Sequence, residues 1–483
     1  MNIQQLFETH HQFLVTGLTT DHRQVKAGDL FVCIKGYTVD GHQFAKAAEE
    51  AGACAIVTMK HLDNLQIPQF IVPDTSLELP RLAHLFYHQP TNNLQLVGVT
   101  GTNGKTTTAY LLEHLLATPH QSVGYIGTNG IRYGNVFIEP KNTTPDALNL
   151  QRILHEMVKT NIQSVALEVS SHALELHRVD YCAFDFAIFT NLTPEHLDFH
   201  PTMRHYFEAK RQLFYQLKPN GYGIINIDDA YGRELLNDLT SRQQPTLTYG
   251  IKQSAHFQAK QIKMTAAGTE FKLHTPDGVY EICVPLLGEF NVYNLLGALA
   301  GAYTSGLSMT HLLERLQTLK PVDGRMEIIH EGQDFTVIVD YAHTPDGVEK
   351  VLEFVNDIKT NKVKVVIGCP GDRDRTKRPV IADLSVQYAD EVIFTTDDPH
   401  SETPEAILDE MTRHLSPETY QSIIDRTEAI QTAIQTAKSN DIVVIAGRGH
   451  EKVQYWKGYT VPLDDREIAK QILRQRLASP AAI

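Results

Sequence analysis

One stretch, "GVTGTNGKTTTAYLLEHLL" at residues 98–116, constrains the fold more than any other. It is typical of a strand that ends in the glycine-rich turn 101–104 and then enters a helix with apolar residues at 111, 112, 115 and 116. Glycines let backbone N–H groups approach phosphate oxygens, and a helix N-terminus adds positive potential. The pattern predicts a nucleotide-binding loop in which Lys105 holds the β and γ phosphates and Thr106 offers its hydroxyl to Mg²⁺.

The loop departs from the strict phosphate-loop pattern at one position. That pattern has a glycine five residues before Gly104, and this chain has Val99 there. The alternative is a glycine turn that precedes a helix by chance. Because strand, loop, Gly-Lys-Thr and helix all follow in order, we favour the phosphate loop, formed by Gly101, Thr102, Asn103, Gly104, Lys105, Thr106 and Thr107.

Strand-like and helix-like segments alternate along the 483 residues, which predicts an α/β fold with parallel sheets. We expect three domains: a small α/β domain over residues 1–90, a central phosphate-loop domain over 91–322 and a Rossmann-like domain over 323–483. The last has four strand-like runs, "FTVIVD", "KVKVVIG", "DEVIFTT" and "DIVVIAG". Ligands gather at the carboxyl ends of such strands, so chemistry is expected there.

Composition narrows the class of protein. A formal charge of −14 argues against nonspecific binding to nucleic acid but leaves room for anionic ligands in local basic sites. The five cysteines are scattered, which suits reduced thiols rather than disulfides or a zinc site. No apolar run is long enough to span a membrane, and the polar N-terminus does not resemble a signal peptide. We therefore expect a cytoplasmic monomer with small-molecule substrates.

A lysine stands out in "HYFEAKRQLF", residues 205–214. The apolar residues of this expected helix fall at 203, 206, 207, 214 and 217, and Lys210 shares their stripe. An unpaired buried ammonium is costly. One alternative is a side chain that snorkels to solvent. The other is a deprotonated amine that reacts with CO₂ to give a carbamate, whose oxygens suit Mg²⁺.

Two further residues are candidate metal ligands. Glu168 ends the strand-like "SVALE", where a carboxylate can bind Mg²⁺ directly or through water, or can be an ordinary strand-terminal glutamate. His196 follows the helix-start signal Thr193-Pro194-Glu195, and a single histidine there is more often structural than a ligand.

The motifs taken together resemble the Mur ligase family along nearly the whole chain. They are "GTNGKTTT", "NTTP", "EVSSHA", "TNLTPEHLDFH", "EAK", "GEFNVYN", "GRME", "DYAHTPDG", "GDRDRTKRP" and "AGRGHE". More narrowly, they resemble the members that add a diamino acid to UDP-N-acetylmuramoyl-L-alanyl-D-glutamate. The resemblance implies ATP and Mg²⁺ as requirements, a carbamylated Lys210, and a metal site at Thr106, Glu168, His196 and Lys210.

The resemblance also implies roles for other residues. Asn291 and Asn294 would contact the adenine, Arg325 would contact the phosphates, and Asp340 and His343 would face the nucleotide. Without the family pattern, Arg325 would be interpreted as a surface residue near a hinge. The contacts implied for the UDP-muramoyl-dipeptide are Asp21, Arg23, Asn142, Thr143, Thr144, Ser170 and Arg178. His22 and Leu176 stand where the family commonly has serine and glutamine, so Asp21 and Arg23 are weaker candidates.

For the incoming amino acid, the resemblance implies Arg373, Gly447 and Glu451, with Asp397, Asp398, Pro399 and His400 discriminating between substrates. Members that add meso-diaminopimelate usually have Asp-Asn-Pro-Arg there, and the arginine can bind the second carboxylate. Loss of that arginine, together with the negative charges of Asp398 and Glu451, favours a side chain that ends in an ammonium group, so we expect L-lysine, with L-ornithine as an alternative. The alternative is that a partly protonated His400 still serves diaminopimelate.

Two other classes of protein share some of these features. A ligase like folylpolyglutamate synthetase shares the central fold, but the N-terminal block and "GRGHE" speak against it. A regulatory nucleotide-binding protein would not need the set of Lys105, Glu168, His196 and Lys210. We therefore expect an ATP-dependent ligase that forms an amide bond through an acyl phosphate.

Overall fold

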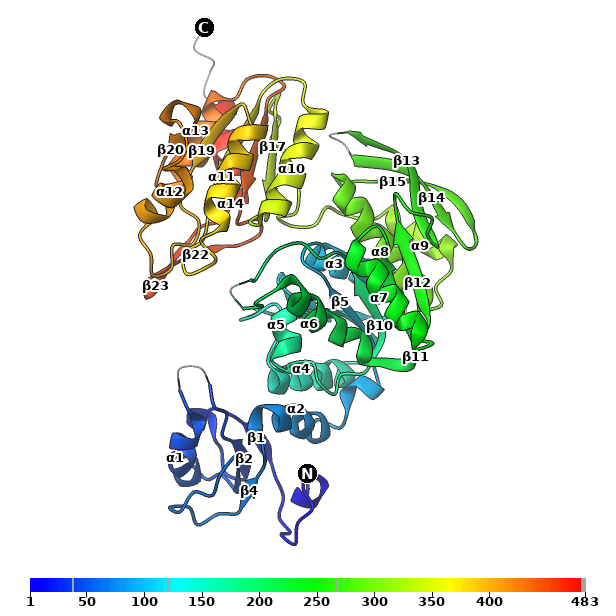
Figure 1. Cartoon of the computed structure of the whole chain (residues 1–483), viewed down its shortest axis with the longest axis vertical. Helices are drawn as coiled ribbons and strands as arrows, with labels where there is room; N and C mark the ends of the chain where they lie inside the picture. The colour runs from blue at the N-terminus through cyan, green and yellow to red at the C-terminus, as the bar shows by residue number, and fades with distance from the viewer. Residues whose placement is uncertain (37–38, 120, 198, 266–267, 479–483) are drawn as a thin grey trace.

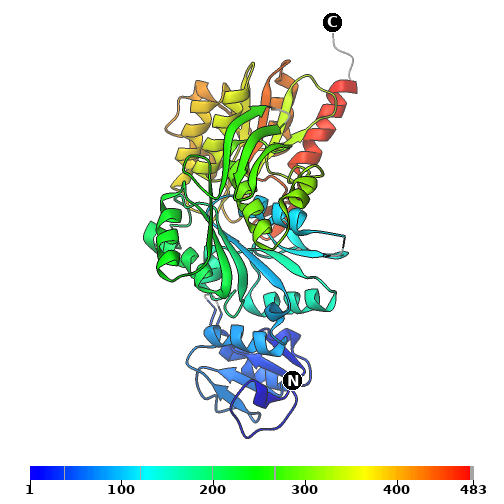
Figure 2. The ribbon, with the colours of Figure 1, turned by 90° about the vertical axis from the view of Figure 1, so that its right-hand side faces the viewer.

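The chain folds into three α/β units, each built around its own sheet, in the computed structural model (Figure 1). The structure describes residues 1–36, 39–119, 121–197, 199–265 and 268–478, so the last five residues of the expected third domain lie outside it. Two perpendicular views place the units one after another along the long axis, with the first and third at opposite ends (Figures 1 and 2). The α/β class predicted from the sequence is confirmed.

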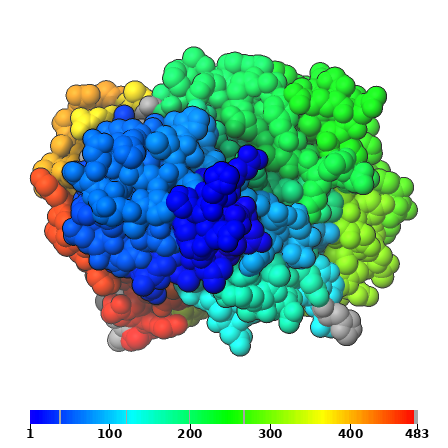
Figure 3. All heavy atoms as spheres, turned by 90° about the horizontal axis from the view of Figure 1, so that it is seen from below, coloured from blue at the N-terminus to red at the C-terminus, as the bar shows by residue number. Residues whose placement is uncertain are grey.

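The first unit has a four-stranded parallel sheet covered on both faces. Its strands lie in the order β1 (Gly17–Thr19), β2 (Asp29–Val32), β3 (Ala55–Thr58) and β4 (Gln69–Ile71). Leu30 and Val32 pack with α2 (Thr75–Phe86), while Phe31 packs with α1 (Ala45–Glu50) on the other face. Figure 3, seen from this end, shows the first unit in front of the central one.

The central unit is built on an eleven-stranded sheet. Its strand order is β15-β14-β13-β12-β11-β10-β5-β9-β6-β7-β8, and the pairs from β13 to β6 are parallel. The bounds are β5 (Gln95–Thr100), β6 (Val123–Gly127), β7 (Gly130–Tyr133), β8 (Val136–Ile138), β9 (Ser164–Glu168), β10 (Phe184–Phe189), β11 (Leu217–Asn226), β12 (Thr246–Gly250), β13 (Phe257–Thr265), β14 (Gly268–Thr275) and β15 (Gly278–Val284). The antiparallel strands at both edges were not predicted from the sequence.

Helices cover both faces of this sheet because its strands alternate their side chains between two cores. Val97 and Val99 of β5 pack with α3 (Lys105–Leu116), α8 (Glu289–Thr304) and α9 (Met309–Leu316). Leu96 packs on the opposite face, with α4 (Ala147–Lys159), α5 (Ser171–Glu175), α6 (Met203–Tyr215) and α7 (Ala230–Ser241). The phosphate loop therefore lies between the central strand β5 and a helix that is buried against the sheet.

Helix α6 confirms the predicted helix around Lys210, with one correction. Tyr206, Phe207, Lys210 and Phe214 are buried on one side of the helix. The expected stripe was too long, because Leu217 lies outside the helix as the first residue of β11. Its apolar side chain belongs to the sheet.

The third unit has a six-stranded sheet in the order β16-β17-β21-β18-β19-β20, in which only β16 is antiparallel. The strands are β16 (Glu327–Ile329), β17 (Thr336–Asp340), β18 (Val363–Ile367), β19 (Glu391–Phe394), β20 (Gln421–Ser422) and β21 (Ile442–Ala446), and the hairpin β22 (Val453–Trp456) and β23 (Tyr459–Pro462) follows. The helices are α10 (Pro345–Ile358), α11 (Lys377–Tyr388), α12 (Pro404–Thr412), α13 (Arg426–Thr436) and α14 (Asp465–Ala478). The four predicted strands are β17, β18, β19 and β21, so their carboxyl ends share one edge.

Among the described residues, no helix combines the length and the apolar character needed to cross a membrane.

Candidate active site

The phosphate loop has the geometry that its glycines require. Gly101 and Gly104 have φ values of +146° and +88°, which only glycine adopts without strain. A Cβ on Gly104 would also lie 2.2 Å from Oδ1 of Asn294. The Lys105 ammonium donates to the carbonyl oxygens of Gly101 at 2.9 Å and Thr102 at 2.8 Å, so it lies against the loop itself.

The segment after β10 holds this loop in place. The N–H of Asn103 donates to Oδ1 of Asn191 at 3.0 Å, and the Thr190 hydroxyl donates to the Asn103 carbonyl oxygen at 2.6 Å. The N–H of Thr193 donates to the Thr102 hydroxyl at 3.0 Å. Residues 190–193 therefore fix both the phosphate loop and the start of the segment that holds His196.

Two of the predicted magnesium ligands are in direct contact. The Thr106 hydroxyl donates to Oε2 of Glu168 at 2.9 Å, and Arg325 donates to the same hydroxyl at 3.1 Å. Glu168 is fully buried and also accepts hydrogen bonds from the Tyr125 hydroxyl at 2.5 Å and the Thr128 N–H at 3.0 Å. A hydroxyl and a carboxylate held this close are the oxygen donors that Mg²⁺ prefers.

Lys210 lies beside the phosphate loop rather than at the surface. Its side chain is 1% exposed, its amine donates to the Gly101 carbonyl oxygen at 2.7 Å, and the amine lies 4.5 Å from the centre of the Tyr206 ring. Burial, together with the nearby charge of Lys105, lowers the pKa of Lys210 well below its usual value. The snorkelling alternative is therefore wrong, because the side chain points inward and lies where an amine is readily deprotonated.

His196 completes the predicted metal set, and its neighbour Glu195 was not predicted. Burial lowers the pKa of His196 to about 4, which leaves its imidazole neutral, as metal binding requires. Glu195 Oε1 lies 3.6 Å from Nε2 of His343 in the third unit. Burial lowers the pKa of both Lys105 and Lys210, and the charge of Glu195 offsets only part of that shift. Its position directly before His196 was the available signal, but we interpreted it only as a helix-start residue.

One cavity of about 490 Å³ lies between the central and third units, and eight of the twelve predicted nucleotide residues line it, whereas Gly101, Thr102, Lys105 and Thr106 do not. Those present are Asn103, Gly104, Thr107, Asn291, Asn294, Arg325, Asp340 and His343. The Arg325 guanidinium lies 4.3 Å from the centre of the Tyr341 ring, which directs it toward Thr106. Asp340 accepts backbone hydrogen bonds from Met326 and Ala342 at 2.7 Å each, so it orders the connection between the units.

A second cavity, of about 290 Å³, lies at the carboxyl ends of the strands of the third unit. Pro194, Glu195 and His196 of the central unit form one wall. The predicted amino-acid residues that line it are Arg373, Asp397, Asp398, His400, Gly447 and Glu451, whereas Pro399 is not among the lining residues. Lys377, which was not predicted, also lines this cavity.

The role expected for Asp398 needs correction. Its carboxylate is paired with the guanidinium of Arg448, which is fully buried, and Oδ1 also accepts the Tyr455 N–H at 3.1 Å. Its charge is therefore largely neutralised and cannot by itself repel a second carboxylate on the substrate. Arg448 lies within "GRGHE", but its pairing with a residue fifty positions away had no local signal.

Asp397 and Glu451 remain as acidic groups of this cavity. Oδ2 of Asp397 is buried and has no hydrogen-bond partner among the described residues, and Gly447 leaves room for it, because a Cβ there would lie 2.5 Å from that oxygen. Burial, reinforced by the charge of Asp397, raises the pKa of Glu451 to about 8. Asp397 is suited to accept an ammonium group, and Glu451, which lies 3.6 Å from the Arg448 guanidinium, is suited to do so once it ionises.

The predicted UDP-muramoyl-dipeptide residues form two separate groups. The Thr144 hydroxyl donates to the Glu168 carbonyl oxygen at 2.7 Å and accepts the Ser170 N–H at 3.1 Å, and Arg178 donates to the Thr144 carbonyl oxygen at 3.0 Å. Thr143 lies 3.1 Å from the Thr128 hydroxyl, next to Glu168, whereas Asn142 is exposed.

Asp21 and Arg23 form the second group, in the first unit. Arg23 donates to both Asp21 oxygens, at 2.9 and 2.8 Å, and this pairing lowers the pKa of Asp21 to about 2.

Comparisons with known proteins agree with this architecture. Family profiles match in three places: Mur ligase family, catalytic domain, at residues 14–84; Mur ligase middle domain at 99–302; and Mur ligase, glutamate ligase domain, at 324–449. A Bacillus cereus protein named UDP-N-acetylmuramoyl-L-alanyl-D-glutamate--2,6-diaminopimelate ligase is 45% identical over 469 residues, 96% of this chain and 95% of its own length. A Listeria monocytogenes protein of the same name is 41% identical over 472 residues, 96% of this chain and 95% of its own.

Solved structures show the same relationship. The structure of a ligase with that name has a TM-score of 0.72 and 32% identity, covering 99% of this chain and 100% of its own. A Mycobacterium tuberculosis folylpolyglutamate synthase has a TM-score of 0.65 at 16% identity, covering 83% of this chain and 95% of its own, which shows a shared fold alone.

Fold and site together define an ATP-dependent ligase that forms amide bonds. The chain belongs to the Mur ligase family, whose three-domain architecture it has in full, and the resemblance found in the sequence is confirmed.

Proposed function

We propose that this enzyme uses ATP to join 2,6-diaminopimelate to the D-glutamate of UDP-N-acetylmuramoyl-L-alanyl-D-glutamate, as a cytoplasmic monomer. In this proposal residues 1–90 bind the UDP-sugar, 91–322 bind ATP and 323–483 bind the amino acid. The main support is the second cavity, which is lined by residues of both the central unit and the third unit. The relatives named above support the choice of amino acid.

The residues at the phosphate loop fit a magnesium ion. The Thr106 hydroxyl, the Glu168 carboxylate and the neutral imidazole of His196 would hold it together with a modified Lys210. When bound, Mg²⁺ supplies positive charge to the phosphoryl group that is transferred. Lys105 and the backbone N–H groups of residues 101–106 would bind the β and γ phosphates.

Lys210 would act as a carbamate. Its deprotonated amine attacks CO₂, a C–N bond forms, and one proton leaves to solvent, so the side chain becomes an anion. The buried position beside Gly101 supports this chemistry, because a neutral amine is nucleophilic and a cation there would lie close to Lys105.

The chain's residues would support two successive displacements. The D-glutamate γ-carboxylate attacks the γ-phosphorus, the bond to ADP breaks, and an acyl phosphate forms. The α-amine of the diamino acid then attacks the acyl carbon, loses a proton, and displaces phosphate. Pro194, Glu195 and Glu451 border the space where this amine would sit, so closure of the two units would keep water from the acyl phosphate.

The charges of the second cavity suit a substrate with two ammonium and two carboxylate groups. Arg373 and Lys377 are its cationic side chains, and Asp397 and Glu451 are available to accept ammonium groups. Lysine has only one carboxylate and would leave one of the two cations without a partner. One observation favours lysine as a second candidate: His400 stands where an arginine would bind the second carboxylate, and its ring stacks on Tyr455 at 5.9 Å.

Phosphate release from ATP tests the proposal. The full chain is assayed with the UDP-muramoyl-dipeptide, Mg²⁺ and either diaminopimelate, L-lysine or L-ornithine. We expect turnover only with both co-substrates present, and a kcat/KM at least tenfold higher for diaminopimelate than for lysine. A preference for lysine or ornithine would contradict the choice of amino acid, while turnover without the dipeptide would contradict the ligase reaction.

The carbamate is tested separately with ¹³C-labelled bicarbonate. We expect one slowly exchanging carbamate signal in the ¹³C NMR spectrum of the wild type and none in Lys210→Met, together with a fall in kcat of about a hundredfold or more, as for loss of a charge-stabilising group. Lys218→Met is the control, because Lys218 pairs with Asp185 at 2.8 Å at the far end of β10. If the signal persists in Lys210→Met, Lys210 is not the modified residue.

A further inference from the structure

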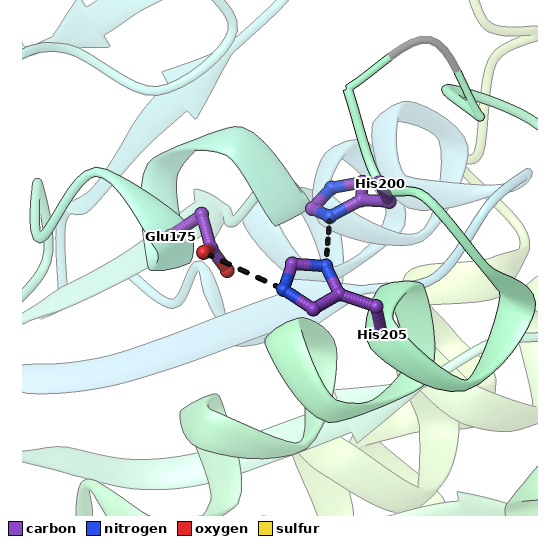
Figure 4. Close-up of side chains that lie close together, drawn as sticks. All are labelled: Glu175, His200 and His205. Atoms are coloured by element: carbon purple, nitrogen blue, oxygen red, sulfur yellow. Dashed lines mark hydrogen bonds and ion pairs between the residues drawn. The ribbon is translucent and has the colours of Figure 1, made fainter.

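Three side chains with metal-binding atoms lie together on the central unit, outside the predicted magnesium site (Figure 4). Glu175 is the last residue of α5, His200 lies just before α6, and His205 lies in the first turn of α6. The Nδ1 atoms of the two histidines are 3.3 Å apart, and Nε2 of His205 lies 3.8 Å from Oε1 of Glu175. None of the three has a part in the proposed reaction.

We propose that Glu175, His200 and His205 form a binding site for a second divalent metal, Zn²⁺, separate from the magnesium site. The histidine geometry supports it. A zinc ion about 2.05 Å from two nitrogen atoms that are 3.3 Å apart would make an N–Zn–N angle of about 107°, close to the tetrahedral value.

The third ligand needs only a small movement. One ligand atom from each residue lies within 4.8 Å of the other two. Tetrahedral zinc requires about 3.4 Å between ligand atoms, so the Glu175 carboxylate and the His205 ring would move by about 1.5 Å or less. Their side chains are 33% and 46% exposed, which permits that movement and leaves room for a water molecule as the fourth ligand.

The donor set selects the kind of metal. Two imidazoles and one carboxylate suit zinc and similar transition metals, whereas Mg²⁺ and Ca²⁺ prefer oxygen ligands throughout. The buried His200 would give the site a fixed anchor, and the two partly exposed residues would admit the ion from solvent. An excess of Mg²⁺ should therefore not displace it.

The site would stabilise the segment that holds His196. Zinc would join α5, the end of this segment and α6, whose aromatic and imidazole rings are in contact here. The His172 ring lies 4.7 Å from that of His196 and 5.7 Å from that of His200, and the Tyr206 ring, against which the Lys210 amine lies, is 5.0 Å from the His200 ring. We expect zinc to raise the melting temperature of the protein, because a ligand that binds only the folded state stabilises it.

Zinc titration of the chelator-treated full chain tests this site. In excess Mg²⁺, calorimetry is expected to show one tight zinc site per chain, and Co²⁺ is expected to give the intense visible absorption of tetrahedral coordination. His205→Gln and Glu175→Gln should each weaken zinc binding at least tenfold and abolish the zinc-dependent rise in melting temperature. His61→Gln, which removes a histidine with a 65% exposed side chain in the first unit, should leave both unchanged.

Each alternative result would overturn the proposal. In one, the wild type takes up no zinc under these conditions. In another, His205→Gln binds zinc as tightly as the wild type does, and in the third the Co²⁺ spectrum is that of octahedral coordination. Because the measurement follows zinc and not turnover, it is independent of the proposed ligase reaction.

Discussion

At the scale of single residues, burial sets the protonation of the groups that would handle the substrates. Desolvation lowers the pKa of Lys210 and of His196 and raises the pKa of Glu451. The Lys210 amine therefore loses its proton more readily than a solvated lysine, and near neutral pH the His196 imidazole is neutral and the Glu451 carboxyl is largely protonated. The first two conditions suit formation of a carbamate and of a metal site. The third affects binding of the amino acid.

Glu451 should make amino-acid binding depend on pH. Its pKa of about 8 means that at lower pH a bound ammonium must first displace a proton. The ionised fraction, and with it the affinity, rises as pH increases, so the KM for the diamino acid should fall about fifteenfold from about pH 6.5 to about pH 8 and only about twofold more above that. Steady-state kinetics across this range measures it.

The matched variant is Glu451→Gln, which keeps the shape of the side chain and removes the ionisation. Its KM should be higher than that of the wild type at pH 8 and nearly flat with pH. An unchanged slope in this variant would show that another group controls the pH dependence.

At the scale of elements, the loop of residues 101–104 between β5 and α3 determines whether phosphate can bind. Gly104 has a positive φ and lies directly against Asn294 of α8, so the loop, its helix and a distant helix fit together only without a side chain there. The pattern of strand, glycine turn and helix is local in sequence, whereas the contact with Asn294 is not.

Gly104→Ala should therefore impair ATP binding more than folding. A side chain at this φ costs about 1–2 kcal/mol, and its Cβ would displace Asn294, so we expect the KM for ATP to rise at least tenfold. Gly306→Ala is the control, because Gly306 has φ +90° but no atom within 4 Å of the new Cβ. In denaturant unfolding, Gly306→Ala should lose about as much stability as Gly104→Ala, but its KM for ATP should not change. A similar rise in the KM for ATP in both variants would indicate general destabilisation.

At the scale of the whole molecule, contacts across the cavity bring the third unit onto the phosphate loop. The amide of Asn103 donates to Oδ2 of Asp346 at 2.6 Å, and His343 lies near Glu195. Both contacts join the central unit to the segment at the start of α10. They favour the closed arrangement in which the two cavities adjoin one another.

Asp346→Ala should shift the protein toward a more open arrangement. Loss of a charged hydrogen bond of about 1–2 kcal/mol corresponds to a five- to thirtyfold shift in such an equilibrium. We expect a larger radius of gyration in X-ray scattering without substrates and a higher KM for the diamino acid. Lys350→Ala removes the 2.8 Å ion pair with Asp346 but keeps Asp346, and should change neither. Equal scattering from Asp346→Ala and the wild type would contradict the proposed role.

The sequence by itself determined the elements and the candidates for chemistry. The strand-like run at β5, the glycine turn and the apolar spacing of α3 and α6 are local signals, and they predicted these elements with only small errors, such as the inclusion of Leu217 in α6. The buried position of Lys210 could be inferred for the same reason, since a helix places residues three and four apart on one face.

The tertiary structure alone decided which charges meet. Asp398 is neutralised by Arg448, fifty residues away, and Asn103 meets Asp346 across 243 residues. No local pattern encodes such pairs, because they depend on how whole sheets stack and dock. The expectation of lysine as substrate depended on an unpaired charge at Asp398. The ion pair between Asp398 and Arg448 removes that basis.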